Sequence, residues 1–269
     1  MKKALINGTG IAYSLNLAGE SDPWLVFSNS LATNHSIWNA QAEAFGASFN
    51  LLCYDQRGHG QSDIPDTSLN FDVLGTDLIA LMDQIDVRKA TAIGLSMGVP
   101  TLFSAYHQAP DRFDALVLLD GQAASAANAA ETWQTRIDQA QLDGMKAFGR
   151  ATASRWLTPQ SHAKKLASLA DMIGATDFSG FKACAQALQA YDYQHVLAAC
   201  KVPVLGLAGE NDGAMPDTMR RYCQQIENAE FAVIDGAGHV PCYEQGDAVN
   251  KAISTFMEKI SLKKPAGCT

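Results

Sequence analysis

Five consecutive residues in the first half of the chain have the types and spacing of a nucleophilic serine. Gly94-Leu95-Ser96-Met97-Gly98 has the form G-x-S-x-G, and it lies between an apolar run and a segment of helical period. In that context the pattern predicts a sharp turn from a strand into a helix, with the serine hydroxyl exposed at the turn. The glycines lack the side chains that would collide with neighbouring backbone in so tight a turn. We therefore expect Ser96 to be a nucleophile.

A serine nucleophile needs a base, because a hydroxyl is weakly nucleophilic at neutral pH. Among the six histidines, His239 lies in a loop of small residues at 235–241, directly after a late apolar run. This position predicts that its imidazole reaches the serine across the edge of a sheet. His59 lies instead in the turn-rich segment 54–63, whose glycines and charged residues indicate a structural hydrogen-bond network.

The base in turn needs a carboxylate that orients its ring. Asp212 follows the strongest strand pattern, at 202–208, and lies between the serine and the histidine in the chain. That order, serine then acid then histidine, is the one expected for a serine in this strand-to-helix context. Two alternatives stay open. Asp120 ends another apolar run, at 115–119, and Glu210 is close enough in sequence to take the same role.

A tetrahedral intermediate also needs two backbone N–H donors for its oxyanion. The residue after the nucleophile, Met97, supplies the first donor. The second is expected from the loop after an earlier strand, where residues 29–31 follow the apolar run 24–28. Leu31 is the favoured donor in that loop.

The elements that must position these residues alternate along the chain. Short runs rich in Val, Ile and Leu are separated by longer segments of helical period, which is typical of a parallel sheet covered by helices on both faces. The predicted strands are 4–6, 11–16, 24–28, 51–54, 90–94, 115–119, 202–208 and 231–234, the first two as an antiparallel pair. The predicted helices are 70–84, 97–108, 216–226 and 247–260.

The alternation stops in one long segment. Residues 123–195 contain no convincing strand and are rich in Ala, Gln and Leu with helical spacing. We interpret this segment as a helical lid inserted between two parts of the core, at 1–122 and 196–269. Ligands bind to open α/β sheets at the carboxyl edge of the strands, so a lid there would enclose a pocket.

Composition excludes several classes of function. The net charge is −8 with acidic and basic residues interspersed, which argues against nucleic acid or anionic membranes as partners. No apolar run approaches the roughly 18 residues of a membrane-spanning helix. The start of the chain resembles a signal peptide only until Asn7-Gly8-Thr9 interrupts it.

The six cysteines indicate a reducing compartment. They are widely spaced, with no CxxC pair and no histidine at metal-ligand spacing, so they are interpreted as buried free thiols. The expected location is therefore the cytoplasm, and no metal site is predicted.

Several motifs together resemble the 3-oxoadipate enol-lactonases of the α/β-hydrolase superfamily. They lie at 28–31, Trp38, 54–63, 94–98, 131–133, 136–137, 209–212 and His239. The resemblance implies an eight-stranded α/β-hydrolase fold, a nucleophile, acid and base at Ser96, Asp212 and His239, and oxyanion donors at Leu31 and Met97. It implies no cofactor. Trp133 and Arg136 in the lid favour the lactonase branch. The chain departs from the pattern at Val99-Pro100 and at 120–123.

The predicted reaction is hydrolysis of a small-molecule carboxylic ester or lactone through an acyl-enzyme. Trp133, Arg136 and His35 are the candidate pocket residues, and Arg155 is a second candidate cation for a substrate carboxylate. A broad carboxylesterase for small acyl groups is the alternative within the enzyme class. A ligand receptor built on a hydrolase site, with little turnover, is the alternative of another class. The sequence does not assign the substrate or the oligomeric state.

Overall fold

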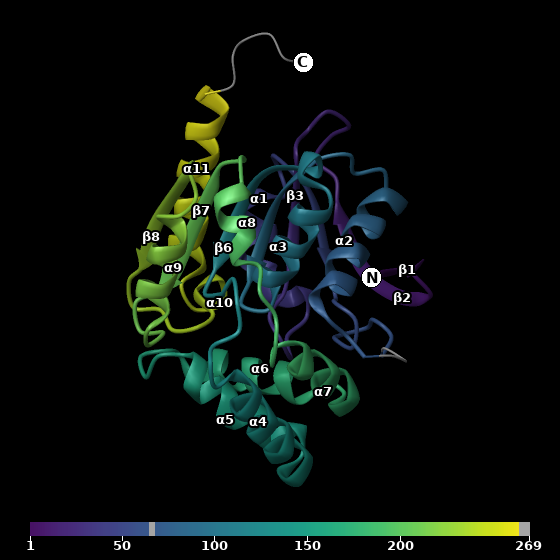
Figure 1. The fold of residues 1–269 in the computed structure, drawn as a ribbon, viewed down its shortest axis with the longest axis vertical. Helices are drawn as coiled ribbons and strands as arrows, with labels where there is room; N and C mark the ends of the chain where they lie inside the picture. Colours follow the sequence, from purple (N-terminus) through teal and green to yellow (C-terminus); the bar gives the residue numbers. More distant parts are fainter. Residues whose placement is uncertain (65–67, 264–269) are drawn as a thin grey trace.

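The centre of the molecule is an eight-stranded sheet, in a computed structural model that describes residues 1–64 and 68–263 (Figure 1). The strand order is β1-β2-β4-β3-β5-β6-β7-β8, with β1 and β2 antiparallel to their neighbours and all later pairs parallel. This confirms the predicted sheet and its antiparallel start. The strands are β1 (Lys2–Ile6), β2 (Thr9–Asn16), β3 (Trp24–Ser28), β4 (Asn50–Tyr54), β5 (Ala90–Leu95), β6 (Phe113–Leu119), β7 (Val204–Gly209) and β8 (Ala229–Ile234).

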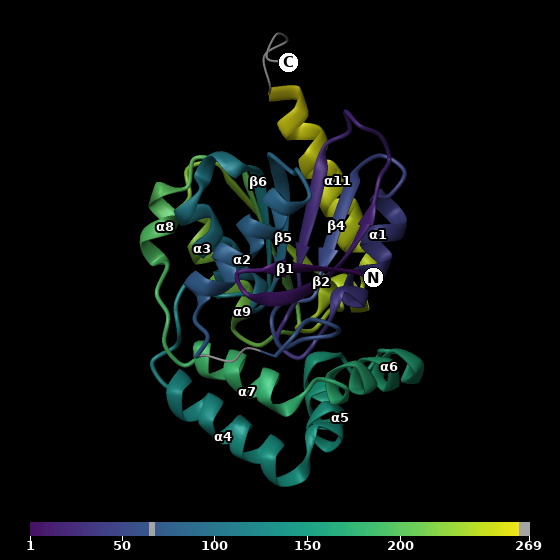
Figure 2. The same cartoon turned by 90° about the vertical axis from the view of Figure 1, so that its right-hand side faces the viewer.

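Helices cover both faces of the sheet, as predicted (Figure 2). One face carries α1 (Asn39–Phe45) and α11 (Gly246–Lys263). The other face carries α2 (Phe71–Gln84), α3 (Gly98–Gln108), α8 (Gln194–Ala199) and α9 (Met215–Cys223). Three short elements lie in connecting segments: η1 (His35–Trp38), η2 (Pro110–Arg112) and α10 (Pro241–Glu244).

The apolar runs form strands because both of their faces are buried. Every residue of β4, β5 and β7 is buried, which is the reason that these runs are nearly continuous rather than alternating. Helix α2 starts one residue later than predicted. Asn70 has extended backbone, and its side chain accepts a hydrogen bond of 2.9 Å from the amide of Val73, so it caps the helix from outside.

Four helices lie together beyond the carboxyl ends of the parallel strands (Figures 1 and 2). They are α4 (Ala129–Asp143), α5 (Met145–Trp156), α6 (Ala163–Gly174) and α7 (Phe178–Ala187). We call them the cap. Their position is that of the predicted lid, although its predicted end at residue 195 falls inside α8, which packs against α3 of the core. The boundaries of a separate lid stay a prediction.

Two predictions from the sequence concern membrane-spanning helices and the state of the cysteines. None of the helices in the described part combines the length and apolar character needed to cross a membrane. Five cysteines are free and buried, namely Cys53, Cys184, Cys200, Cys223 and Cys242. Cys268 lies outside the described residues, and the cytoplasmic location stays a prediction.

Candidate active site

Ser96 lies in a strained turn between β5 and α3. Its φ angle is +53°, in the left-handed region that non-glycine residues rarely adopt. Its amide donates to the carbonyl of Leu119 over 2.8 Å, which ties the turn to the end of β6. The glycines are required by close approach of backbone, because a Cβ on Gly98 would lie 2.3 Å from the carbonyl oxygen of Ser28. A Cβ on Gly94 would lie 2.7 Å from the carbonyl oxygen of Gly98.

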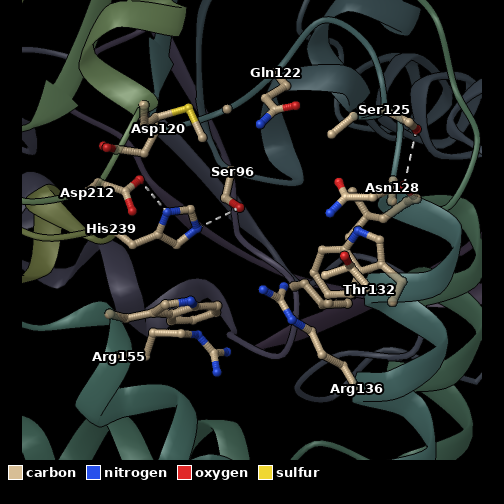
Figure 3. Close-up of a pocket in the computed structure, with 18 of the residues that line it drawn as sticks. Ser96, Asp120, Gln122, Ser125, Asn128, Thr132, Arg136, Arg155, Asp212 and His239 are labelled. Atoms are coloured by element: carbon tan, nitrogen blue, oxygen red, sulfur yellow. Dashed lines mark hydrogen bonds and ion pairs between the residues drawn. The ribbon is translucent and has the colours of Figure 1, made fainter.

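Three of the predicted site residues form one chain of hydrogen bonds (Figure 3). Nε2 of His239 lies 3.0 Å from Oγ of Ser96, and Nδ1 lies 2.7 Å from Oδ2 of Asp212. With the proton on Nδ1, the ring donates to the carboxylate and accepts the serine proton at Nε2. The arrangement is that of a nucleophile, a general base and a carboxylate that orients the base.

The loop that carries His239 is fastened to the cap. The His239 amide donates to the carbonyl of Trp156 at the end of α5, over 2.8 Å. The indole of Trp156 lies beside the imidazole, with ring centroids 5.1 Å apart. At Gly238 a Cβ would be 2.2 Å from the same carbonyl oxygen, so only glycine permits this contact. The cap therefore helps to hold the imidazole in place.

Among the three candidate acids, Asp212 is the one that contacts the imidazole. Glu210 instead accepts a hydrogen bond from the amide of Gly236, at 2.9 Å. Asp120 accepts one from the amide of Gly209, also at 2.9 Å. Burial opposes ionisation of Asp212, but the charge and the hydrogen bond of His239 outweigh it and lower the pKa of this carboxyl. Asp212 is thus the anion at the site.

Asp120 differs from Asp212 in its surroundings. It is completely buried at the end of β6. Burial first, and then the negative charge of Asp212, raise the pKa of Asp120 well above its ordinary value. One ligand atom each of Asp120, Asp212 and His239 lie within 4.8 Å of one another, which is close enough for metal binding. Both ring nitrogens of His239 already have partners, however, so the trio fits proton transfer better than metal ligation.

The predicted oxyanion donors come from two different segments of the chain. Leu31 follows β3 and lines the pocket, whereas Met97 is buried at the start of α3. Within residues 1–64 and 68–263, neither backbone N–H donates a hydrogen bond to another protein group. Two such donors beside a nucleophile can stabilise an oxyanion.

A buried histidine shapes the loop that contains Leu31. Ala32 has a φ of +57°, and its amide donates to Nε2 of His59 over 2.8 Å. Nδ1 of His59 donates to the carbonyl of Arg57, so the ring is neutral with its proton on Nδ1. Burial lowers the pKa of His59, which keeps it neutral. This is the structural network that its motif predicted.

A glutamine connects the two halves of the candidate oxyanion hole. Nε2 of Gln56 donates to the carbonyl of Asn29 over 2.6 Å, and its Oε1 accepts from the hydroxyl of Thr101 at 3.0 Å. The same hydroxyl lies 3.0 Å from the carbonyl of Met97. Gln56 therefore holds the loop after β3 and the first turn of α3 at a set separation. Sequence reasoning did not single out Gln56 or Thr101.

A pocket of about 310 Å³ opens beside Ser96, between the sheet edge and the cap. Trp133 and Trp156 supply apolar walls, and Figure 3 shows the Arg136 side chain extending from α4 towards Ser96. Gln122, Ser125, Asn128 and Thr132 add polar side chains to the lining of the pocket. The pocket is thus mixed in character, with two arginines from the cap, apolar rings and several neutral hydrogen-bonding groups.

The two arginines of the pocket have no acidic partner in the described part of the chain. The guanidinium of Arg136 lies over the ring of Trp133, 4.5 Å from its centroid. Arg155 donates to the hydroxyl of Thr152 at 3.3 Å. Burial, and then the charge of Arg155, lower the pKa of Arg136, and burial lowers that of Arg155. Because arginine stays protonated, the site holds two positive charges that a ligand anion could neutralise.

Comparison with known families identifies the architecture. The model of the family described as "alpha/beta hydrolase fold" matches residues 23–245. The chain belongs to the α/β-hydrolase fold family. It is a hydrolase, as the sequence predicted.

The similar proteins confirm the resemblance stated from the motifs. This hydrolase is 31% identical to 3-oxoadipate enol-lactonase 2 of Acinetobacter baylyi, over 96% of this chain and 98% of the relative. The crystal structure of the enol-lactonase from Burkholderia xenovorans has 32% identity and a TM-score of 0.89, covering 96% and 100% of the two chains. A thermophilic esterase from Thermogutta terrifontis shares the fold, with a TM-score of 0.89 at 23% identity over 96% and 98% of the chains.

Not all candidate pocket residues of the hydrolase lie at the pocket. Trp133, Arg136 and Arg155 line it, but His35 does not. The His35 amide donates to Asp55 at 2.7 Å, and its Nδ1 lies 2.9 Å from the same carboxylate oxygen. This pairing turns the ring towards the loop after β4. Nothing in the local sequence around His35 revealed that partner, which is 20 residues further along the chain.

Proposed function

We propose that this hydrolase cleaves a carboxylic ester or lactone through a covalent acyl-enzyme on Ser96. The observation that carries the proposal is the continuous hydrogen-bond chain from Ser96 through His239 to Asp212. Two further features support it. The nucleophile lies in a strained turn with a left-handed backbone, and the amides of Leu31 and Met97 donate no hydrogen bond to another protein group in the described residues.

The reaction has two halves. Nε2 of His239 accepts the proton of Ser96 as Oγ attacks the substrate carbonyl carbon, and the oxyanion receives hydrogen bonds from the two free amides. His239 then returns the proton to the leaving oxygen as the C–O bond breaks, which leaves an ester on Ser96. In the second half a water molecule gives its proton to His239 and attacks that ester, releasing the acid and restoring Ser96.

The charge of the pocket indicates the class of substrate. Arg136 and Arg155 line the pocket and carry positive charge without an acidic partner in the described residues. A guanidinium matches the planar geometry of a carboxylate. We infer a substrate that carries a carboxylate apart from the ester or lactone group. The enol-lactonases among the similar proteins are consistent with a lactone.

The test is steady-state hydrolysis by wild type and Ser96→Ala. The substrates are p-nitrophenyl acetate, p-nitrophenyl butyrate and an enol-lactone that bears a carboxylate. We expect kcat to fall at least about 10³-fold in the variant, because removing the nucleophile of such a relay removes most of its catalysis. Ser179→Ala, at an exposed position of α7, is the matched control.

The outcomes separate the alternatives. Equal rates in wild type and Ser96→Ala contradict the serine mechanism. Preference for the neutral esters over the lactone favours a broad carboxylesterase. One equivalent of product per wild-type molecule, with no further turnover, favours a receptor.

A further inference from the structure

Asp120 is a buried carboxyl with an oxygen that has no partner. Its exposure is zero, and its backbone has a φ of +43°, held by a hydrogen bond of 3.1 Å from its amide to the carbonyl of Leu207. Oδ1 accepts the Gly209 amide, but Oδ2 accepts no hydrogen bond from any residue that the structure describes. An ionised carboxylate in this state would have one uncompensated oxygen in a medium of low polarity, which is costly.

A second carboxyl lies beside it. An oxygen of Asp120, an oxygen of Asp212 and a ring nitrogen of His239 lie within 4.8 Å of one another. Two carboxylates at such a separation repel each other strongly, so one of them takes up a proton. Figure 3 shows the two carboxyl groups on neighbouring segments at the end of the sheet, with Asp212 between Asp120 and the imidazole.

The surroundings decide which of the two keeps the proton. Asp212 accepts the Nδ1–H of His239, and its side chain is 21% exposed. Asp120 has one amide donor and no exposure. Ionisation is therefore less costly at Asp212 than at Asp120.

We propose that Asp120 is a positioning residue, held as a neutral acid, which donates a hydrogen bond from Oδ2 to the Asp212 carboxylate. The inference rests on the proposed function, because Asp120 would orient Asp212, the carboxylate that in turn orients His239. The bond keeps Asp212 ionised and limits its rotation, so that its Oδ2 stays on the Nδ1–H of His239. The directions of the two carboxyl pKa values, raised at Asp120 and lowered at Asp212, agree with a proton held on Asp120.

The titratable groups facing Asp120 come from three segments. They are Asp212 after β7, His239 after β8, and the thiol of Cys242 in α10, whose pKa is raised chiefly by burial. The thiol is neutral at ordinary pH. Proton exchange around Asp120 therefore involves the two aspartates and the histidine.

Two substitutions test whether Asp120 acts as a hydrogen-bond donor rather than through a negative charge. In Asp120→Asn an amide can still accept the Gly209 N–H and donate to Asp212, so it should retain most of kcat. In Asp120→Leu a side chain of similar size has no donor, and we expect kcat to fall about tenfold to a hundredfold, the range typical when a group that orients a functional ligand is removed. Equal kcat values for the two variants would overturn the proposal.

A spectroscopic measurement needs no substrate. Wild type should show the infrared C=O stretching band of a protonated carboxyl at neutral pH, shifted in D₂O and absent from Asp120→Asn. Identical infrared spectra of wild type and Asp120→Asn would contradict a neutral Asp120. This readout is independent of the proposed reaction, so a failure of the serine mechanism leaves it interpretable.

Stability provides a second test that remains if the leucine variant does not fold. A raised pKa in the folded state means that the protonated carboxyl of Asp120 stabilises the folded protein. This contribution is fully present below the pKa of the unfolded state, near the ordinary value of 3.8, and is lost as pH rises through the pKa of the folded state. Asp120→Asn has no such titration. Its free energy of unfolding, measured by urea titration relative to wild type, should therefore increase with pH above about 4. A difference that does not change with pH would oppose the proposal.

Discussion

At the scale of single residues, two arginines in the pocket give the candidate site its positive charge. Each lies on a cap helix, and neither has an acidic partner among the described residues. Burial lowers the pKa of both guanidinium groups, because a buried charge is less well hydrated than an exposed one. A bound carboxylate would restore that lost stabilisation.

Substituting Arg136 by Met keeps most of the apolar stem and removes the charged guanidinium that lies over Trp133. For a substrate that carries a carboxylate, we expect KM to rise about tenfold to a hundredfold, because a hydrogen bond to a charged group contributes about 1.5–3 kcal/mol. For p-nitrophenyl acetate KM should stay unchanged. Steady-state kinetics with both substrates measures the difference, and Arg150→Met, exposed on α5 and outside the pocket, is the control. An equal effect on both substrates would contradict the carboxylate subsite.

At the scale of elements, the site depends on how closely β3, β5 and α3 approach one another. Gly98 is the contact between the first turn of α3 and the end of β3. The loop with the second candidate oxyanion donor, Leu31, begins directly after that strand end. The separation of the two oxyanion donors therefore depends on a backbone contact that admits no side chain.

Replacing Gly98 by Ala should damage both stability and activity. The added Cβ would lie 2.3 Å from the carbonyl oxygen of Ser28, and backbone cannot yield as a side chain can. We expect a loss of about 1–3 kcal/mol in the free energy of unfolding, as for other overpacked sites, and a lower kcat. Urea denaturation and ester hydrolysis check these effects. Gly19→Ala, where the near atoms belong to the flexible side chain of Asp22, should change neither.

At the scale of the whole molecule, the cap and the core are joined at the site through one buried carboxylate. Oε1 of Glu244, in α10, accepts from the amide and the hydroxyl of Thr158 and from the hydroxyl of Ser161, both in the segment between α5 and α6. Oε2 accepts from the amide of Gly238, at 2.7 Å. The residue before the candidate base is thus coupled to the cap.

The substitution Glu244→Gln tests this coupling. Both oxygens of Glu244 face donors, so the amide nitrogen of glutamine must meet a donor on one side whichever way it turns. We expect a loss of about 1–3 kcal/mol in the free energy of unfolding, typical of a buried donor left unpaired, together with a lower kcat. Thermal or urea unfolding measures the first effect. Glu43→Gln, exposed on α1, is the control, and equal stability of the two variants would argue against the role of Glu244.

Much of the fold and of the site followed from the sequence by itself. The strands were predictable because their residues are buried on both faces and form apolar runs that local composition reveals. The Ser96 turn was predictable because the G-x-S-x-G pattern, the apolar run before it and the helical period after it are adjacent in the sequence. The loops after β7 and β8 placed Asp212 and His239 at the same edge, since parallel strands end together there.

Tertiary structure alone decided which side chains meet. The choice of Asp212 over Asp120 and Glu210 depends on the paths of three loops, and the pairing of His35 with Asp55 removes a residue that its sequence position had placed in the pocket. The burial of a polar atom without a hydrogen-bond partner, as at Oδ2 of Asp120, also depends on how the whole chain packs. Local sequence encodes the strands and turns because neighbouring residues determine them, whereas contacts between distant segments depend on the packing of the whole chain.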